Sequence, residues 1–462
     1  MIYFLASIAA IAGFLFGYDE GVIAVAGPLL EGDFTMSPLV RGFMTAAVPL
    51  GALVAASVAG PIADRFGRRR VLMSAAALFT VGALIAAAIT TVWMLVAARL
   101  VLGLAIGVAA VTAPLYIAES APLKSRGGMV ATYQLAITIG ILGSYLTGLV
   151  ITGAGMWRLM FGLGAVPGLL FLVGLAFLPE SPRWLVLKGF ASEARAALGR
   201  VRPPGWDVDG ELEEMVLTAK AEAGHKVGYR ALFEPAVRPA LIVAVGLFFL
   251  QQLSGINAVV YYAPEIFDQA GFDSADTRIL ASVGIGTVNF MTTILAMFLI
   301  DRVGRRPLLI LGFAGTAATM LIIALAVLNV TLVPSWLVIA MLLLYIASFA
   351  ISVGPLPHVM MSEIFPLRAR GPGMSMASIS NWGFNFVVVF AFPLMLAGPG
   401  LALTFTLFAV ICLGGILFTL LRVPETTGLS LEAIEKHLQS GKPLVALRRE
   451  VFVGVAVATY KK

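Results

Sequence analysis

The chain alternates long apolar runs with short polar loops over most of its length. Twelve of these runs are near or above the length of about 20 residues that crosses a bilayer as a helix. The pattern therefore predicts an all-α membrane protein with twelve transmembrane helices. The expected spans are 2–30, 39–63, 71–91, 93–120, 128–151, 157–178, 237–266, 276–300, 307–328, 335–361, 371–396 and 400–422.

One long polar stretch separates six apolar runs from the next six. We therefore expect two pseudo-symmetric six-helix halves with a cytoplasmic linker of short helices between them. The expected parts are an N-terminal half at 1–178, the linker at 179–236, a C-terminal half at 237–422 and a cytoplasmic tail at 423–462. In the tail, Ser430 is expected to cap an amphipathic helix, and the apolar run 451–460 is too short to span a membrane.

Three polar phrases occur once in each half, at nearly equal spacing. The first phrase reads DRFGRR in the N-terminal half and DRVGRR in the C-terminal half. The matching pairs are 64–69 with 301–306, 119–127 with 363–371, and 179–181 with 424–426. An internal duplication in so hydrophobic a chain is typical of secondary transporters.

Composition and charge support a membrane location. Hydrophobic residues make up 60% of the chain and charged residues 12%, whereas about a quarter of the residues of a soluble domain are charged. The net charge of +6 does not indicate a nucleic-acid partner, because the basic residues lie on one side of the expected membrane. All lie in alternate loops or the tail except Arg41, Arg99, Arg158 and Arg278. This predicts a multi-pass protein of the cell membrane, in contact with lipid, with both termini cytoplasmic.

Two opposite charges lie inside expected spans, Asp19 in the first and Arg99 in the fourth. Ionisable groups within hydrocarbon are costly and usually functional. A nearby arginine favours the ionised carboxylate while burial favours the neutral form, so Asp19 could couple a proton to a conformational change. The alternative is a permanent salt bridge that joins two helices. Glu20 has a weaker case and could face a polar crevice.

Amide side chains form a second group of polar residues within the spans. In the seventh span, positions 251, 255, 258 and 262 are expected to share one face of a continuous helix, with 252 and 257 beside it. Because amides donate and accept hydrogen bonds, they suit a neutral polyhydroxylated ligand. The alternative is hydrogen bonding between helices. The polar candidates are Gln134, Gln251, Gln252, Asn257, Asn289, Asn381 and Asn385, with Tyr262 and Trp382 beside them.

The repeated loop phrases place acidic and basic side chains together at the cytoplasmic rim. They can form charge-assisted networks that hold the inside closed in one state, or their arginines can simply fix the orientation in the membrane. In the first half the candidate gate residues are Asp64, Arg65, Arg68, Arg69, Glu119, Arg126, Glu180 and Arg183. In the second half they are Asp301, Arg302, Arg305, Arg306, Glu363, Arg370 and Glu425.

These motifs together resemble the sugar porter family of the major facilitator superfamily over essentially the whole chain. The residues that carry the resemblance are the doubled DRxGRR, PESPRWL at 179–185, QQLSGINAVVYYAP at 251–264 and PETTGLSLE at 424–432. The resemblance implies twelve helices in two halves with a sugar held between them. It further implies that Gln134, Gln251, Gln252, Asn257, Asn289 and Asn381 hydrogen-bond the sugar and that Tyr262 and Trp382 line its cavity.

Two positions bear on coupling and substrate. The acid that follows Phe-Gly-Tyr, Asp19, resembles proton-coupled members of the family, whereas facilitative animal glucose carriers have asparagine there. Arg99 would then be its counter-charge. At His358 the family usually has a tryptophan that stacks on the sugar. The smaller imidazole can line the cavity and hydrogen-bond, or it can titrate near neutral pH and modulate coupling.

The resulting expectation is a monomeric secondary active transporter that imports a monosaccharide by proton symport through alternating access. The substrate could be a hexose, a pentose or a related polyol. The alternatives are a facilitative sugar uniporter and a transporter-like sugar sensor. No cofactor, metal or enzymatic activity is expected, because the sequence has no metal-ligand cluster, no nucleophile beside a base and no Walker-type loop.

Overall fold

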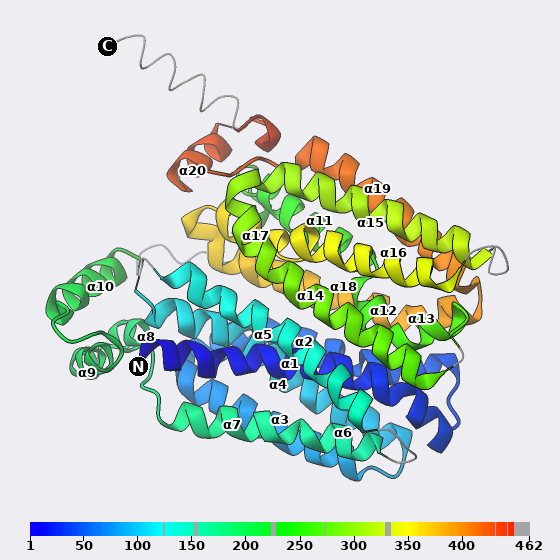
Figure 1. The fold of residues 1–462 in the computed structure, drawn as a ribbon. Coiled ribbons are helices and arrows are strands. Elements are labelled where there is room, and N and C mark those ends of the chain that lie inside the picture. Colours follow the sequence, from blue (N-terminus) through cyan, green and yellow to red (C-terminus); the bar gives the residue numbers. More distant parts are fainter. Residues whose placement is uncertain are drawn as a thin grey trace. The chain divides into compact units, whose positions relative to one another are not determined.

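The computed structural model describes residues 1–122, 125–151, 156–222, 228–272, 274–328, 334–429, 431–440 and 442–447. Twelve helical segments in this part of the chain are long and apolar enough to cross a membrane, and these residues include no strand. The expected all-α membrane fold with twelve spans is therefore confirmed. The chain divides into two compact units, Met1–Lys226 and Val227–Lys462 (Figure 1). The four-part division of the sequence stays a prediction.

Six spans belong to the N-terminal unit. They are α1 (Ile2–Asp33), α2 (Pro38–Phe66), α3 (Arg68–Ala88), α4 (Val92–Ser120), α5 (Arg126–Val150), and α6 (Trp157–Leu163) continued by α7 (Ala165–Ala176). Local sequence sets several of the helix ends. The Ser37 hydroxyl accepts the backbone N–H of Val40 ahead of α2, and the Thr91 hydroxyl accepts that of Met94 at the start of α4. Gly67, at φ +96°, separates α2 from α3.

Glycines bring α1 into close contact with α5. A Cβ atom added to Gly17 would lie 1.9 Å from the carbonyl oxygen of Ile137, and one added to Gly140 would lie 2.3 Å from that of Phe14. Helix association in lipid depends on close packing, because lipid tails are as apolar as the side chains that they would replace. This contact holds the α1 segment that carries Asp19 against α5.

The variant Gly17→Ala should destabilise the protein, because its new methyl group meets a backbone carbonyl that cannot move aside independently. We expect a loss of about 1–3 kcal/mol, the usual cost of overpacking. The control is Gly27→Ala on the same helix, where a Cβ meets no atom within 4 Å. Thermal unfolding of the purified variants measures the difference, and equal unfolding temperatures would contradict the close α1–α5 contact.

The N-terminal unit continues into three short helices, α8 (Pro182–Leu187), α9 (Ala191–Val201) and α10 (Val208–Glu222). Trp184, Leu185, Ala194 and Ala197 form a small buried cluster among them. The indole N–H of Trp184 donates to the carbonyl oxygen of Asp64 at 2.9 Å. This bond attaches the short helices to the end of α2.

Arg202 should stabilise these helices much more than Arg195 does. Arg202 is 1% exposed, pairs with Glu211 and donates to the carbonyl oxygen of Ser120 at 2.6 Å, whereas Arg195, paired with Asp209, is 61% exposed. Arg202→Ala leaves the carbonyl oxygen of Ser120 without this donor and Glu211 without its cation, and an unpaired buried acceptor costs about 1–3 kcal/mol. We expect limited proteolysis between α8 and α10 to accelerate in Arg202→Ala and to change little in Arg195→Ala. Equal rates would contradict this.

The same contact should depend on pH in a defined direction. Burial raises the pKa of Glu211, but the hydrogen bonds and charge of Arg202 outweigh burial, and the pKa lies below its ordinary value. A carboxyl group with a lowered pKa contributes stability above its unfolded pKa and loses it as the pH falls through the folded pKa. Protection from proteolysis should therefore be full at neutral pH and decrease on acidification below the ordinary carboxyl range.

The C-terminal unit holds the other six spans and the beginning of the tail. Its helices are η1 (Tyr229–Phe233), α11 (Arg238–Leu253), α12 (Ile256–Tyr261), α13 (Ala263–Gln269), α14 (Ala275–Val303), α15 (Arg305–Leu328), α16 (Ser335–Ser348), η2 (Phe349–Val353), α17 (Leu356–Ile364), η3 (Leu367–Ala369), α18 (Arg370–Ala397), α19 (Gly400–Arg422), α20 (Leu431–Gln439) and η4 (Leu444–Ala446). The expected amphipathic helix in the tail is α20, which buries Ile434 and Leu438. Ser430 and 451–460 lie outside the described residues.

Two spans of the C-terminal unit are broken. Gly255, at φ +92°, separates α11 from α12, and a π-helical turn leads from α16 into Gly354-Pro355 ahead of α17. The expectation that 251, 255, 258 and 262 share one face of a continuous helix is therefore wrong. A left-handed glycine turns the chain and ends the 3.6-residue periodicity on which that expectation rests.

Candidate functional site

Asp19 on α1 and Arg99 on α4 form a buried ion pair within the N-terminal unit. Their side chains are 3% and 0% exposed. The guanidinium faces the carboxylate with both of its terminal nitrogens, at 3.4 Å from Nη1 to Oδ1 and 3.3 Å from Nη2 to Oδ2. Charge-assisted hydrogen bonds of this kind are usually about 2.7–2.9 Å long. Asp19 is therefore held loosely by its partner.

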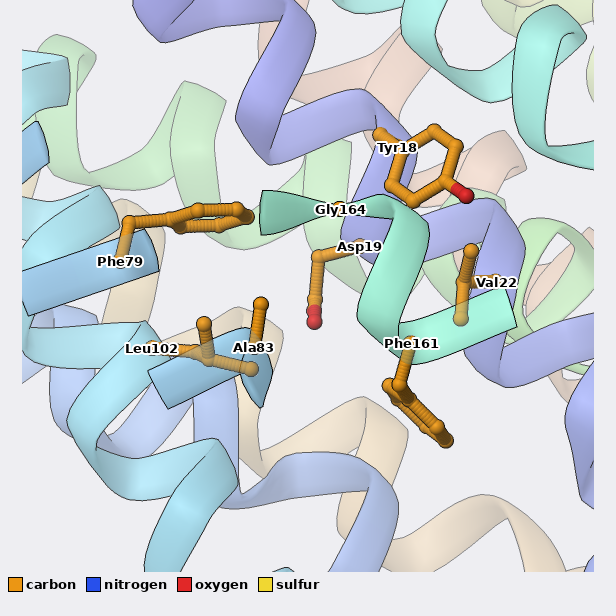
Figure 2. Close-up of a pocket in the computed structure, with 8 residues that line it drawn as sticks. All are labelled: Tyr18, Asp19, Val22, Phe79, Ala83, Leu102, Phe161 and Gly164. Carbon is orange, nitrogen blue, oxygen red and sulfur yellow. The ribbon is translucent and has the colours of Figure 1, made fainter. Parts of the chain in front are cut away.

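The pocket beside Asp19 is lined mainly by apolar side chains. The Asp19 carboxylate lies at this small pocket, whose lining draws on several helices of this unit (Figure 2). The lining residues are Tyr18, Asp19, Val22, Phe79, Ala83, Leu102, Phe161 and Gly164. The Tyr18 hydroxyl is used elsewhere, since it donates to the carbonyl oxygen of Met160 at 3.0 Å. Arg99 is the cation that compensates the charge of Asp19.

Three amides of the C-terminal unit form a chain of hydrogen bonds. Asn257 Nδ2 donates to Gln252 Oε1, and Gln252 Nε2 donates to Asn381 Oδ1. Gln252 lies on α11, Asn257 on α12 and Asn381 on α18. The structure thus brings together residues 129 positions apart in the sequence, and it leaves an acceptor oxygen at one end of the chain and a donor nitrogen at the other.

Gln251 fills the break between η2 and α17. Its Nε2 donates to the carbonyl oxygens of Val353 at 2.9 Å and Gly354 at 2.6 Å. Among the described residues, its buried Oε1 has no hydrogen-bond partner, and the same holds for Oδ1 of Asn385. An unpaired buried polar atom costs about 1–3 kcal/mol. Each oxygen would therefore gain from a ligand hydroxyl.

His358 lies close to Gln251 at the same break. Its side chain is exposed, Nδ1 is 3.4 Å from the carbonyl oxygen of Gly354, and the ring meets Phe248 edge-on with centroids 4.9 Å apart. The carbonyl oxygen of Gly354 therefore lies within hydrogen-bonding distance of both the Gln251 and the His358 side chains. The imidazole is available to a ligand in a way that a fully packed side chain would not be.

The remaining candidates for a sugar site differ in their settings. Trp382 is buried on α18. Tyr262 is also buried: its hydroxyl donates to the carbonyl oxygen of Val389 at 3.1 Å and its ring packs on Phe392, so it lines no open space in this structure. Asn289 and Gln134 are partly exposed, and neither side chain makes a hydrogen bond within the described part of the chain. Gln134 belongs to the N-terminal unit and the others to the C-terminal unit.

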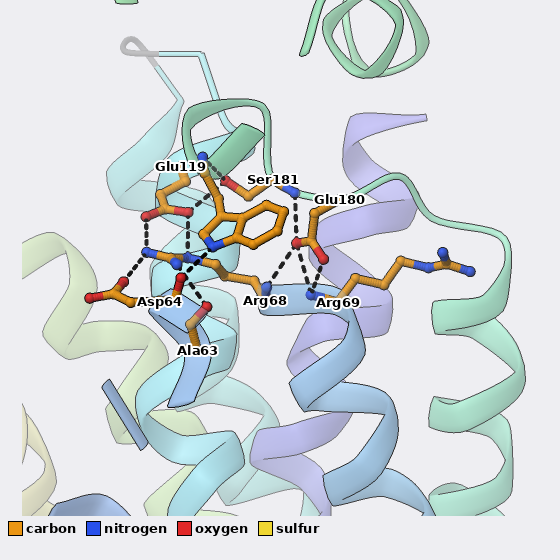
Figure 3. A network of polar contacts seen from close by, with 8 residues as sticks. Ala63, Asp64, Arg68, Arg69, Glu119, Glu180 and Ser181 are labelled. Atoms are coloured by element: carbon orange, nitrogen blue, oxygen red, sulfur yellow. Dashed lines mark hydrogen bonds and ion pairs between the residues drawn. The ribbon is translucent and has the colours of Figure 1, made fainter. Parts of the chain in front are cut away.

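The repeated loop phrase of the N-terminal unit forms a dense network around Arg68 (Figure 3). Arg68 donates from Nε and Nη2 to the two oxygens of Glu119, each at 2.9 Å, and pairs with Asp64 at 3.0 Å. The Ser181 hydroxyl donates to Glu119 at 2.6 Å. Glu180 accepts the backbone N–H groups of Arg68 and Arg69 at the start of α3, where a helix N-terminus favours a negative charge.

The C-terminal unit repeats this network around Arg305. Its Nη2 pairs with Glu363 at 3.0 Å and with Asp301 at 3.1 Å. Glu425 accepts the backbone N–H groups of Arg305 and Arg306. Burial raises the pKa of Glu425, but its hydrogen bonds, the largest from the Thr427 side chain, outweigh burial and hold the pKa below its ordinary value. The two units therefore have equivalent networks at the starts of equivalent helices, α3 and α15.

The other expected arginines differ in their settings. Arg126 and Arg370 keep a buried Nε without a hydrogen-bond partner among the described residues. Arg65 lies over the ring of Phe66. Arg302 is exposed, and Arg183 is near enough to Arg126 to repel its charge.

Sequence reasoning missed two hydroxyl groups of these networks. Ser181 donates to Glu119, and Thr426 donates to Glu363. Their signal was present in the sequence, since PES at 179–181 matches PET at 424–426 with a hydroxyl residue third in each. It also missed the backbone carbonyl oxygens of Met44 and Thr45, which accept hydrogen bonds from Arg99.

Comparison with known proteins agrees with this architecture. The family model described as "Sugar (and other) transporter" matches residues 5–438. The galactose-proton symporter of Escherichia coli K12 is 40% identical over 447 residues, covering 96% of each chain. The arabinose-proton symporter of the same strain is 36% identical over 448 residues, covering 96% of this chain and 94% of the symporter.

Solved structures lead to the same group of proteins. A structure of the xylose transporter XylE from E. coli superimposes with a TM-score of 0.81 at 30% identity, covering 93% of this chain and 99% of the other. The matched proteins are transporters rather than enzymes. With a doubled loop motif, twelve spans and these whole-length matches, the chain belongs to the sugar porter family of the major facilitator superfamily.

Proposed function

We propose that the protein imports a monosaccharide together with a proton, by alternating access, across the cell membrane and with both termini cytoplasmic. The observation that carries the proposal is the Asp19–Arg99 pair: a carboxylate buried within a span, held by one cation at more than 3.2 Å. A permanent structural salt bridge would be expected to be shorter. Relatives named as galactose-proton and arabinose-proton symporters support the same coupling.

The amides of the C-terminal unit support a sugar as substrate. Within the described part of the chain, the Gln252 hydrogen-bond chain ends in an acceptor oxygen and a donor nitrogen that have no partner, and two buried amide oxygens lack donors. Hydroxyl groups can satisfy all of these at once, since each donates and accepts. The relatives are named for both a hexose and a pentose, so we propose a hexose, a pentose or a related polyol. His358 adds a polar group at the same site.

The mechanism follows from the state of Asp19. Protonation removes the charge that faces Arg99, and binding of the sugar satisfies the amides. Together these events lower the barrier between the two access states. One proton moving down a membrane potential of 100 mV supplies about 2.3 kcal/mol, enough for about 50-fold accumulation. We propose that the two cytoplasmic networks act as the gate whose bonds change between the states.

Transport in proteoliposomes tests this proposal. Labelled galactose, glucose, xylose, arabinose and inositol are offered to the purified protein, and both counterflow and uptake driven by pH or voltage are measured. Symport predicts that at least one sugar both exchanges and accumulates. Exchange without any dependence on the proton gradient would establish a facilitator instead. No exchange of any of these sugars would overturn the transport proposal in favour of a sensor.

Gln252→Leu should weaken sugar binding without uncoupling transport. The change removes the central member of the amide chain and leaves Asn257 and Asn381 without their shared partner. We expect the KM for counterflow to rise about 10-fold or more, with accumulation at saturating sugar retained. The control is Thr292→Val on α14, whose hydroxyl bonds only within its own helix. An unchanged KM would place the sugar elsewhere.

A further inference from the structure

Pro49 lies buried in the middle of α2. Proline has no backbone N–H, so the carbonyl group of Thr45, four residues earlier, cannot form its usual helical hydrogen bond. The proline ring also clashes with that carbonyl and tilts it away from the helix axis. In a membrane span, a carbonyl released in this way needs another donor.

Arg99 supplies that donor. Its Nη2 is 3.4 Å from the carbonyl oxygen of Thr45, and its Nε is 2.9 Å from that of Met44 in the same turn of α2. The two oxygens of Asp19 are 3.3 and 3.4 Å from the guanidinium. The shortest of these contacts is with the carbonyl oxygen of Met44. The same Nη2 is shared between the released carbonyl oxygen of Thr45 and Oδ2 of Asp19, at nearly equal distances.

We propose that Pro49 is a positioning residue for proton coupling, because the Thr45 carbonyl that it releases shares Nη2 of Arg99 with Asp19 and so keeps Asp19 loosely bound. This inference rests on the proposed symport. An arginine with backbone acceptors of its own stays partly satisfied when Asp19 becomes neutral. The cost of leaving a buried guanidinium without its anion is thereby reduced, and Asp19 can take up and release its proton.

The other groups around Asp19 leave this control to Arg99. Helices α4, α5, α6 and α7 pack on α1. Glu20, the next residue on α1, interacts with Tyr133 and Tyr145 of α5. The Tyr18 hydroxyl is engaged by Met160 of α6. The residues that α3, α6 and the α6–α7 turn contribute to the pocket are Phe79, Ala83, Phe161 and Gly164, and none of these has an ionisable side chain.

Pro49→Ala tests the proposal, since alanine restores the N–H group that competes for the Thr45 carbonyl. Arg99 then interacts more strongly with Asp19 and favours its ionised form. We expect the midpoint of the pH profile for sugar uptake to move about one unit to lower pH. The control is Pro61→Ala, the same change on the same helix at an exposed position. No shift, or an equal shift in both variants, would overturn the proposal.

Infrared titration separates this proposal from the proposed function. The carboxylic acid C=O band of Asp19, identified by its loss in Asp19→Asn, is followed against pH in parent and Pro49→Ala protein. A shifted midpoint in a parent that transports without protons leaves Pro49 as the positioning residue and rejects symport. An unshifted midpoint in a proton-coupled parent rejects the role of Pro49 alone. Pro49→Gly, which also restores the N–H group, replaces Pro49→Ala if the latter does not fold.

Discussion

Asp19→Asn should abolish proton-driven accumulation of sugar while leaving exchange intact. Asparagine keeps the size of the side chain and can still accept a hydrogen bond from Arg99, but it cannot titrate. At 100 mV the parent should accumulate its sugar about 50-fold from voltage alone, and the variant should reach only equal concentrations on both sides. The measurement compares voltage-driven uptake with counterflow in the same proteoliposomes.

Asp33→Asn is the matched control for this variant. Asp33 ends the same helix, α1, is partly exposed, and accepts the indole N–H of Trp157 at 2.7 Å. This variant should keep both exchange and accumulation. Asp19→Asn protein that still accumulates sugar would show that Asp19 is not the coupling group. Loss of exchange as well as accumulation would favour the structural salt bridge.

Arg68→Ala should destabilise the protein more than the equivalent change Arg305→Ala. Arg68 and Glu119 are 4% and 7% exposed, whereas Arg305 and Glu363 are 11% and 21% exposed. Removing one partner of a buried pair leaves an uncompensated charge and costs about 3–5 kcal/mol. The greater exposure of Glu363 reduces that cost in the C-terminal unit. Thermal unfolding of the two variants measures the difference.

Two further variants identify the cause of this loss. Arg65→Ala, which removes an exposed arginine of the same phrase, should change the unfolding temperature little. The double variant Arg68→Ala/Glu119→Gln should recover part of the stability lost in Arg68→Ala, because it removes the unpaired charge. Equal losses in Arg68→Ala and Arg305→Ala would mean that burial does not distinguish the two networks.

Local patterns predicted much of this protein. Span number follows from apolar length, because transfer into lipid depends on composition summed over about 20 residues. The two charge networks follow from the repeated phrases, since Arg68 and Arg305 stand at the same place in each. The amide partners Gln252 and Asn257 are five residues apart, and the structure joins them.

Other features depended on contacts that no local pattern contains. The break at Gly255 ended a helical face that periodicity predicted to continue. Tyr262 is buried, with its hydroxyl group donating to the carbonyl oxygen of Val389 on α18. Arg68 presents two parallel N–H groups to Glu119, a pairing that the loop phrases alone did not specify.

The sequence by itself determined the twelve spans, the two halves and the residue types that lie within the membrane. Only the tertiary structure decided which atoms meet: that Arg99 contacts the backbone of α2 more closely than it contacts Asp19, and that Ser181 and Thr426 complete equivalent networks. The physical reason is that the two kinds of interaction depend differently on distance. Apolar transfer is insensitive to small displacements, whereas a hydrogen bond changes over tenths of an ångström and depends on helices far apart in the chain.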